Sequence, residues 1–566
     1  MTVESLITQH IDTWTSAVKT KSTTGRGSSK KLELYGVKKL RELILELAVR
    51  GKLVPQDPSD ESVSVLLERI AEKKAQLVKE KKIKKPKKLA EVYDNEFSFE
   101  LPSTWDIKRL PEVYYTISPS GKKLKSSDVL EEGSYPVIDQ GQGDIAGYSN
   151  DEERLINIES PIIIFGDHTR NIKYIDFSFV PGADGTKILC PVGIVAEFFY
   201  LQLKSYDLES RGYGRHFKIL NENLFVIPPL EEQHRIVAKV DELMALCDQL
   251  EQQTEASIEA HQLLVSTLLN TLTNSADADE LMENWARISD HFDTLFTTEE
   301  SIDQLKQTIL QLAVMGKLVP QDPSDEPASV QLERIAEEKA QLIKEKKIKK
   351  QKALPPIAND EKPFDLPNGW EWCRFEDVVE IYSGITKGRK LSGRELKTIP
   401  YLSVANVQRG YLNLQNVKEI DLPIDEIEKY SVLEGDLLIT EGGDWDKVGR
   451  TAIWRSEVPY MAHQNHVFKA RPYLSEQSEV WIEMYLNGPF ARDYFAGSSK
   501  QTTNLASINK TQLRSCFIAV PPNGEKQRIT SKVKDLIEMC NLLLERIARC
   551  QQTQYHLTDA IVEQAI

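Results

Sequence analysis

The chain has 566 residues, of which 40% are hydrophobic and 28% are charged, and this is the balance of an ordinary globular protein. No run of about 18 apolar residues is present, and the N-terminus lacks a basic start followed by an apolar core, so neither a membrane span nor a secretory signal is expected. The net charge of −15 argues mildly against a nucleic-acid partner, although local basic patches could still bind one.

Two helices are predicted near the N-terminus, after a segment (residues 20–31) whose composition predicts a flexible surface linker. Leu40, Leu43, Ile44 and Leu47 share one helical face, and this helix should end at Gly51. Asp57-Pro58 predicts the start of the next helix, because Asp is a good cap and Pro suits the first helical position. The apolar stripe of that helix is Val63, Leu66, Leu67, Ile70, Leu77 and Val78.

This helical pair occurs twice in the chain. Residues 45–85 and 310–350 agree at 34 of 41 positions without a gap, and both contain the eleven residues GKLVPQDPSDE. The same offset of 265 aligns two F-x-L-P-x-x-W segments, at Phe99–Trp105 and Phe364–Trp370. Two further segments, FVIPPLEEQHRI (225–236) and FIAVPPNGEKQRI (517–529), match at an offset of 293 from their proline pairs (228–229 and 521–522) onwards, so the second intervening domain is longer by 28 residues.

Each of these last segments leads into a long helix. Apolar residues then recur at steps of 4, 3, 4 and 3, which is the seam of a coiled coil. The two seams are Ile236, Val240, Leu243, Cys247 and Leu250, and Ile529, Val533, Leu536, Cys540 and Leu543. Cys247 and Cys540 are therefore predicted core residues. The scattered cysteines, at 190, 247, 373, 516, 540 and 550, form no C-x-x-C pair and predict free thiols in a reducing cytoplasm, without disulfides or zinc.

The order of the segments predicts an α+β fold with a circular, pseudo-twofold arrangement. The middle of the chain contains both types of helix, whereas each end supplies only one type, so the two ends together rebuild the middle. We expect two globular α/β domains, at 101–230 and 366–522, separated by long helical spacers. The helical regions should be 1–100, 231–365 and 523–566. Residues 101–230 and 366–522 are called the first and second variable domains below.

The chain resembles the specificity subunit of type I restriction–modification enzymes. The resemblance covers nearly the whole chain and rests on the paired L-A-V-x-G-K-L-V-P-Q segments, the L-P-x-x-W segments and the segments IPPLEEQHRI and VPPNGEKQRI. It implies that each variable domain is a target recognition domain for one half of a split, asymmetric DNA site, and that the long spacers pack as an antiparallel coiled coil. It also implies that two methyltransferase subunits and the restriction/translocase subunits bind this chain, that they carry AdoMet, ATP and Mg²⁺, and that adenine is methylated.

The residues themselves agree with a non-catalytic binding subunit. The sequence contains no N-P-P-Y motif for adenine methylation, no G-x-x-x-x-G-K-[ST] loop for ATP and no glycine-rich AdoMet loop after a strand. Asp377 with the later ELK (395–397) matches a nuclease motif only at chance level. His463 and His466 have the spacing of a metal pair but lack a third ligand nearby.

A DNA reader needs cations for phosphates and Arg, Lys, Asn or Gln for base edges. In the first variable domain such residues form three clusters: Lys122 and Lys123; His168, Thr169 and Arg170; and Arg211, Tyr213, Arg215 and Lys218. In the second the candidates are Thr386, Lys387 and Arg389; Asn406, Gln408 and Arg409; Trp445, Lys447 and Arg450; and Lys500, Gln501 and Asn504. The alternative for each residue is an ordinary solvated surface side chain.

The charge balance predicts weak DNA binding by this chain alone. Residues 103–230 carry 13 Lys and Arg against 18 Asp and Glu, and residues 368–522 carry 18 against 20. The lysine runs at 79–88 and 344–352 could contact the DNA backbone, lie in solvent at a helix end or contact an acidic partner surface. Two rival interpretations stay open from the sequence: a coiled-coil adaptor that organises protein partners without DNA, and an enzyme fused to a reader.

Overall fold

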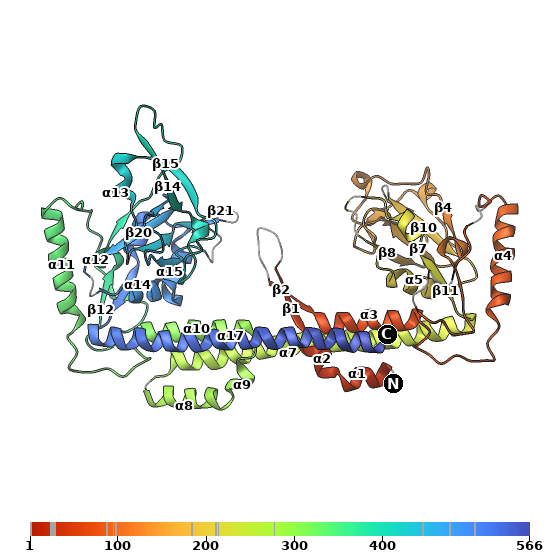
Figure 1. The fold of residues 1–566 in the computed structure, drawn as a ribbon, viewed down its shortest axis with the longest axis horizontal. Coiled ribbons are helices and arrows are strands. Elements are labelled where there is room, and N and C mark those ends of the chain that lie inside the picture. The colour runs from red at the N-terminus through yellow and green to blue at the C-terminus, as the bar shows by residue number, and fades with distance from the viewer. Residues whose placement is uncertain are drawn as a thin grey trace. The chain divides into compact units, whose positions relative to one another are not determined.

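The computed structural model describes residues 3–22, 30–85, 89–93, 96, 99–182, 185–209, 212, 214–276, 278–443, 447–474, 477–502 and 505–566. The chain forms two compact units, one of Met1–Ser257 with Gln551–Ile566 and one of Ile258–Cys550. Among the described residues, no helix is both long and apolar enough to cross a membrane. Each unit contains one variable domain and the helices that support it (Figure 1).

Unit 1 begins with helices α1 (Val3–Gln9) and α2 (Ile11–Ser16), a hairpin of strands β1 (Val18–Ser22) and β2 (Lys30–Leu34), and helix α3 (Tyr35–Val49). The predicted linker over 20–31 is therefore wrong where it overlaps these two strands, and its residues 23–29 lie outside the described residues. The helix predicted from Leu40 to Leu47 is confirmed as α3, which ends before Gly51 at a φ of 68°.

The repeated eleven residues connect α3 to α4 (Val63–Lys79) and, in unit 2, α10 (Glu299–Val314) to α11 (Ala328–Lys344). The predicted start of the second helix at Asp57-Pro58 is wrong. Asp57 instead accepts hydrogen bonds from the backbone and side chain of Ser59, and Ser62 caps α4. The short polar side chain closes its own turn, and this competes with its use as a helix cap.

The eleven residues also fasten the two ends of each variable domain to the helices. In unit 1, Arg235 forms an ion pair with Asp60 at 2.7 Å, and a Cβ on Gly51 would lie 2.4 Å from Pro102. In unit 2, Arg528 and Asp325 form the same ion pair, and Gly316 packs in the same way against Pro367. The repeat thus lies where the chain enters and leaves each domain.

The first variable domain is built on a four-stranded antiparallel sheet of order β4-β10-β7-β8, beside a three-stranded sheet of order β6-β5-β9. The β3–β11 pair closes the domain, since it joins the first strand of the domain to the last. The bounds are β3 Asp106–Arg109, β4 Tyr114–Ile117, β5 Tyr135–Ile138, β6 Gly147–Ser149, β7 Ile162–Gly166, β8 Ile172–Ile175, β9 Val180–Pro181, β10 Thr186–Pro191, β11 Leu224–Ile227, α5 Ala196–Ser205 and α6 Phe217–Leu220.

The second variable domain repeats this topology although its sequence has diverged. Its sheets have the orders β13-β20-β16-β18 and β15-β14-β19, its closing pair is β12–β23, and β17, β22 and β21 form a further sheet. The bounds are β12 Glu371–Arg374, β13 Val379–Tyr382, β14 Leu396–Leu402, β15 Lys418–Pro423, β16 Leu437–Thr440, β17 Gly442–Gly443, β18 Thr451–Ile453, β19 Ala462–His463, β20 Val467–Pro472, β21 Lys500–Thr502, β22 Leu505–Ser507, β23 Phe517–Val520, α12 Phe375–Val378, α13 Ile427–Tyr430, α14 Glu479–Asn487, α15 Pro489–Ser498 and α16 Lys510–Ser515.

Two long helices, α7 (Leu230–Asn274) and α17 (Asn523–Ala565), run from the exit of each domain. In unit 1, α3 contacts both of them: Arg41 pairs with Asp248 at 2.6 Å, and the Tyr35 hydroxyl donates to Asp559 at 2.6 Å. Just after the C-terminal end of α3, Gln56 reaches Glu232 and Lys52 reaches the carbonyl of Ile566. α3 is therefore antiparallel to α7 and parallel to α17, and this confirms the predicted antiparallel helices. The predicted seam residues Ile236, Val240, Leu243, Cys247, Ile529 and Cys540 are buried.

A second helical repeat, which the sequence reading missed, lies outside the variable domains. Helices α8 (Ala278–Asp290) and α9 (Phe292–Leu295) of unit 2 correspond to α1 and α2 of unit 1. His10 and His291 precede the second helix of each pair with the same φ of −117°. Four of the seven residues in 7–13 and 288–294 are identical, at an offset of 281. The β1–β2 hairpin is thus an insertion into an otherwise duplicated frame.

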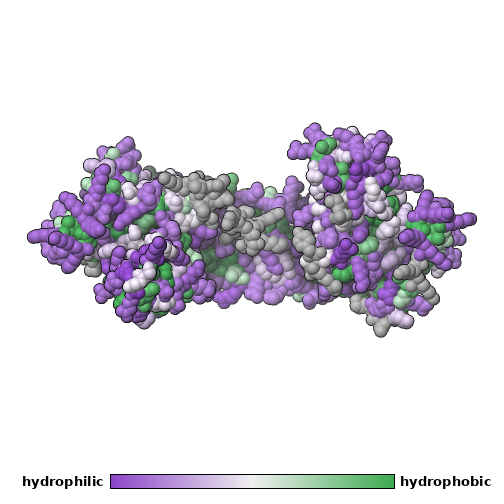
Figure 2. Space-filling model, turned by 90° about the horizontal axis from the view of Figure 1, so that it is seen from above, coloured by the Kyte–Doolittle hydropathy of each residue, from purple (hydrophilic) through white to green (hydrophobic). Residues whose placement is uncertain are grey.

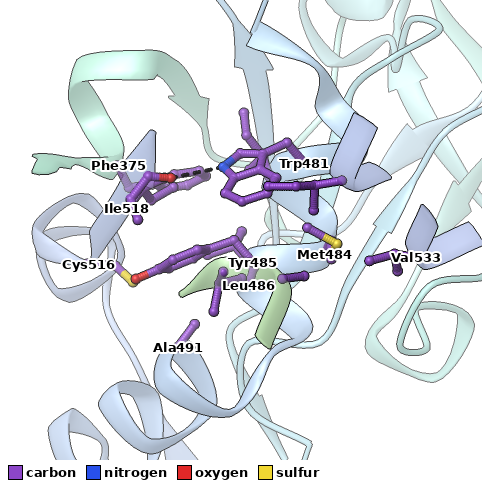
Figure 3. Packing of buried hydrophobic residues seen from close by; sticks show 14 of the residues in the cluster. Phe375, Trp481, Met484, Tyr485, Leu486, Ala491, Cys516, Ile518 and Val533 are labelled. Carbon is purple, nitrogen blue, oxygen red and sulfur yellow. Dashed lines mark hydrogen bonds between the residues drawn. The ribbon is translucent and has the colours of Figure 1, made fainter. Parts of the chain in front are cut away.

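The core of unit 2 joins the second variable domain to its helices. Trp481 and Tyr485 of α14 pack beside Phe375 and Ile518, and the Trp481 indole donates to the Ala519 carbonyl at 2.9 Å (Figure 3). Val533 of α17 belongs to the same buried cluster, so the domain and the long helix share one core. The hydrophobic side chains are thereby used inside, and the surface seen from above is mostly hydrophilic, with small separate apolar patches (Figure 2).

Candidate nucleic-acid interface

In the first variable domain, the loop between β7 and β8 holds His168, Thr169 and Arg170. The Thr169 hydroxyl donates to the Gln140 carbonyl at 2.6 Å, and the His168 backbone N–H donates to the Gln140 side-chain oxygen at 3.2 Å. Arg170 is exposed and has a φ of 63°, and its guanidinium donates to the Leu208 carbonyl at 2.6 Å. The loop is therefore a rigid projection whose exposed side chains are polar.

The third predicted cluster of this domain lies beside that loop. His168 Nδ1 is 3.3 Å from the Gly214 carbonyl oxygen, and the His216 backbone N–H donates to the Asp167 carbonyl at 2.8 Å. Arg215 and Lys218 are exposed. Arg211 and Tyr213 lie outside the described residues. The structure thus brings the 168–170 and 214–218 segments together, and the two predicted clusters form one surface.

Lys122 and Lys123 are less available for contact with DNA than the other predicted residues of this domain. Both are half-buried, and the Lys122 ammonium donates to the Leu155 carbonyl at 2.6 Å. The Lys123 carbonyl accepts a hydrogen bond from Arg154 at 2.6 Å. The hydrogen bond of Lys122 shows that its ammonium helps to hold this loop in place.

Residues 139–146, which the sequence reading missed, support the first interface. Gln140 makes the hydrogen bonds to His168 and Thr169 described above, and its carbonyl also accepts from the Asn171 side chain at 2.9 Å. The buried Lys173 holds the same segment through the Gly143 carbonyl, at 2.5 Å. The signal in the sequence was D-Q-G-Q-G directly after the apolar strand YPVI, since glycines and glutamines after a buried strand form a polar loop.

In the second variable domain, Gln408 and Arg450 meet although they are 42 residues apart. The Arg450 guanidinium donates to the Gln408 side-chain oxygen at 2.7 Å, and the Gln408 amide donates to the Ala405 carbonyl at 2.9 Å. Arg409 and Lys447 are half-buried nearby in sequence, and Trp445 lies outside the described residues. Two of the predicted clusters therefore form one surface.

Asn406 differs from its prediction because it is a buried structural residue. Its side-chain oxygen accepts from the backbone and hydroxyl of Ser403, at 2.9 and 2.7 Å. Its amide nitrogen donates to the carbonyls of Asn413 and Asn416, at 2.9 and 3.3 Å. With only 3% of its surface exposed, Asn406 shapes the 403–416 loop and is not placed to meet a base.

The loop after β13 joins the same surface. The Ile385 N–H donates to the His463 carbonyl at 2.9 Å, and the Asn465 N–H donates to the Ile385 carbonyl at 3.0 Å. Thr386 and Lys387 are exposed, and the Lys387 ammonium lies 5.0 Å from the ring centre of Tyr401. Arg389 is held in an ion pair with Glu426 at 2.8 Å, so much of its charge is balanced within the domain.

The hairpin of β21 and β22 completes this surface. β22 pairs with β17, which contains Gly442 and Gly443 of the glycine-rich turn. Lys500 and Gln501 lie in β21, opposite Ser507 and Ala506, but their side chains are outside the described part of the structure, as is Asn504. The backbone pairing alone shows that the 500–507 and 442–450 segments are neighbours.

His463 and His466 do not form a metal pair. The His463 ring is fully buried, and this burial lowers its pKa to about 4, so it is neutral and bonds to the Val467 carbonyl at 2.7 Å. His466 Nδ1 instead pairs with Glu441 at 2.5 Å. Among the described residues, no group of three His, Cys, Asp or Glu side chains could hold a metal ion.

The predicted clusters of the two domains occupy equivalent positions in the shared topology. The 166–171 loop between β7 and β8 corresponds to the 440–450 loop between β16 and β18, and Arg170 and Gly449 donate the same backbone hydrogen bond to the first residue of each loop. His216 and Ile508 donate to Asp167 and Glu441 in the same way. The two domains therefore present unlike side chains from the same loops.

The chain matches a known protein family in two segments. A family model described as "Type I restriction modification DNA specificity domain" matches residues 102–260 and 367–549. The chain is 43% identical over 603 residues to the type I restriction enzyme EcoAI specificity subunit of Escherichia coli and 41% identical over 607 residues to the EcoEI specificity subunit of the same species. Each match covers 100% of both chains.

Solved structures match more weakly. One from work titled "Structural basis underlying complex assembly and conformational transition of the type I R-M system" has a TM-score of 0.45 and 17% identity, over 83% of this chain and 99% of that chain. The sequence relatives and the family model therefore carry the assignment. The chain belongs to the family of type I restriction–modification specificity subunits, the non-catalytic components that give such enzymes their DNA specificity.

Proposed function

We propose that each variable domain reads one half of a bipartite, asymmetric DNA site, and that its base contacts come from the loops at one end of its central sheet. The observation that carries this proposal is the shared topology of the two domains. The same loops project in both, yet their side chains differ: His168, Thr169 and Arg170 in one, and Lys447 and Arg450 in the other. Equivalent loops with unlike polar residues suit two unlike half-sites.

The chemistry of these loops fits base edges and phosphates. Arg binds guanine O6 and N7 in the major groove, and Gln binds adenine N6 and N7. In the second domain the Arg450–Gln408 pair presents both groups together, with Lys387 and Thr386 exposed nearby in the same surface. We propose Thr169, Arg170 and Arg215 for the first domain, with Gln140 and Asn406 as positioning residues for the loops.

Phosphate neutralisation should come largely from partner subunits. Neither variable domain is basic overall, and Arg389 is already balanced by Glu426. Weak binding by the isolated chain, with a shallow dependence on salt, follows from this balance. A steep, high-affinity interaction of the isolated chain with DNA would contradict the proposal.

We further propose that the duplicated helical frame organises two methyltransferase subunits and, through the complex, the restriction subunits. AdoMet, ATP and Mg²⁺ would then be bound by those partners, and adenine would be the methylated base. One support is the duplication itself, because two copies of a frame offer two equivalent sites. The other is the names of the full-length relatives, which are components of type I restriction enzymes.

A domain exchange tests the reading function. Residues 103–230 would be replaced by the corresponding domain of a relative with a different target, and the methylated sites of the reconstituted complex would be mapped across a genome. One half-site should change while the other half-site and the gap stay the same. Exchange of residues 368–522 is the matched control and should change only the opposite half. A change in both halves, or in neither, would contradict the assignment.

A further inference from the structure

The exposed faces of α4 and α11, with the lysine runs that follow them, are almost identical in the two units. Residues 61–85 and 326–350 are all described, and at positions exposed in both copies the only difference is Ser62 against Pro327. The exposed Lys73 of α4 is also replaced in α11, by the half-buried Glu338. At positions buried in both copies, Val63 and Leu66 are replaced by Ala328 and Gln331. Identity is thus greater on the outside than on the inside, the reverse of what a purely structural helix would show.

The side-chain interactions on this outer face are duplicated too. Arg334 pairs with Glu326 at 2.7 Å, and Arg69 pairs with Glu61 in the same way. The Gln341 amide donates to Glu345 at 2.6 Å, as the Gln76 amide does to Glu80 at 2.8 Å. These exposed contacts add little to stability, so stability alone does not explain why both copies keep them.

The first seven residues of each lysine run, 79–85 and 344–350, are called the run from here on, and the two share an unusual backbone. Lys81 and Lys346 both have a φ of 59°, in the left-handed region at the helix end where glycine is favoured. The Lys81 and Lys82 N–H groups donate to Val78 and Leu77, at 3.0 and 2.9 Å, so the helix closes as it would around a glycine. Both copies nevertheless keep a lysine there, and each run holds five lysines and one glutamate.

The lysine runs lie away from the reading loops of their own domains. In unit 1, the hydrogen bond to Glu80 raises the pKa of Lys82, and the charge of Glu159 raises it further, so Glu159 lies near this lysine. Glu159 precedes β7, whereas the 166–171 loop follows the other end of that strand. In unit 2, Ile348 and Lys349 line a small cavity with Val379 and Tyr473, at the ends of β13 and β20 opposite the reading loops. A duplex held by the reading loops would therefore lie away from these lysines.

We infer that the outer face of α4 with its lysine run, and that of α11 with its run, are two equivalent docking surfaces for two copies of one protein partner. The partner must present an acidic patch to the lysines and a shallow apolar contact to Val65 and Val330, which are 41% and 36% exposed. The inference rests on the proposed function, in which the methyltransferase subunit is the protein present twice. It adds the surface on which each copy docks.

Stoichiometry tests this inference. The full chain is mixed with the purified methyltransferase subunit of the same system, and the complexes are counted by native mass spectrometry. One variant reverses the charge at three positions of the first run: Lys81→Glu, Lys84→Glu and Lys85→Glu. The second variant does the same in the other run: Lys346→Glu, Lys349→Glu and Lys350→Glu. The native chain should bind two copies, each variant one tight copy, and the combined variant should bind both copies about 10- to 100-fold more weakly.

Matched variants separate charge from folding. Lys→Arg at the same six positions keeps the charge and should still bind two copies. Two tightly bound copies on the combined Glu variant would overturn the inference while leaving the proposed function intact. The inference is also wrong if that variant keeps two copies but binds DNA more weakly with a reduced salt slope, since the lysines would then contact DNA. Failure of the native chain to bind the methyltransferase would instead contradict the proposed function.

Discussion

At the scale of single residues, Arg170 and Gly449 show how one loop position serves two domains. Both have positive φ values, 63° and 71°, at the same place in equivalent loops. Gly449 is fixed by packing, because a Cβ there would lie 2.2 Å from Phe495. Arg170 bears the left-handed backbone without being glycine, a cost of about 1–2 kcal/mol that is typical of functional sites.

Arg170→Gly should therefore separate stability from DNA binding. Removal of the backbone cost should leave the melting temperature unchanged or higher, whereas loss of the guanidinium should weaken binding of the target by the reconstituted complex by about 5- to 100-fold. Differential scanning fluorimetry and fluorescence anisotropy measure the two effects. Ser456→Gly, which relieves the same backbone conformation (φ of 60°) at an exposed position outside the reading loops, is the matched control and should not change DNA affinity. Unchanged affinity in Arg170→Gly would remove this residue from the interface.

Glu483 of α14 provides a pH-dependent test of the second domain. Burial raises the pKa of Glu483 to about 7, and its carboxyl oxygen accepts from the Ile453 N–H at 3.0 Å. An acid whose pKa is raised by folding costs stability as the pH rises from about 4.5 through 7, because the unfolded chain ionises first. Glu483→Gln keeps an acceptor without the charge. It should raise the unfolding free energy by about 1–3 kcal/mol at pH 8 and by nothing at pH 4. Chemical denaturation at both pH values measures this difference, and an equal effect at both would refute it.

At the scale of elements, the end of α4 allows a helix-capping test. Lys81→Gly should stabilise the helix by about 0.5–1 kcal/mol, because glycine adopts the left-handed C-terminal position without strain. The neighbouring Lys82→Gly should bring no gain, since Lys82 is absent from the residues with positive φ among those that the structure describes. Thermal unfolding of the two variants makes the comparison, and an equal response would show that the φ of 59° at Lys81 carries no cost.

The elements that could be predicted from the sequence are those whose signal repeats along the chain. The seam through Ile236 and Cys247 repeats every three or four residues, so local periodicity was enough. The start of α4 was mispredicted because Asp57 uses its side chain in its own turn. The α1–α2 and α8–α9 repeat was missed because the β1–β2 insertion shifts its offset from 265 to 281 and only four of seven residues match.

The loops of the candidate site could be found from the sequence, but the roles of single residues could not. Glycines beside Arg, Lys and Gln mark polar turns, and this signal located the 166–171 and 440–450 loops. Whether a polar side chain faces outwards depends on contacts distant in sequence. Asn406 is buried by carbonyls seven and ten residues away, and Gln140 supports a loop 28 residues away. Such contacts between distant residues cannot be inferred from the local amino-acid composition.

At the scale of the whole molecule, the duplicated frame is continuous except at the chain ends. The Ile566 carbonyl accepts from Lys52 as the Thr273 carbonyl accepts from Lys317, so the end of α17 occupies in unit 1 the place that α7 occupies in unit 2. Both chain ends belong to unit 1. At the offset of 293, Ile566 corresponds to Thr273, and at the offset of 281, Val3 corresponds to Asn284. Residues 274–283 of unit 2 therefore bridge the interval that the chain ends leave open in unit 1.

A circular permutant tests this equivalence. A linker of about ten flexible residues would join Ile566 to the N-terminus, since such a linker spans roughly 17 Å on average. New ends would be opened between Ser275 and Ala278, in the connection from α7 to α8. If the frame is circular, the permutant should fold with a melting temperature within a few degrees of the native chain, and its reconstituted complex should methylate the same sites.

A second permutant, opened inside β7 at Ile164, is the control and should not fold, because that strand is buried at the centre of a sheet. If the first permutant also failed to fold, the α7–α8 connection would be essential and the frame linear.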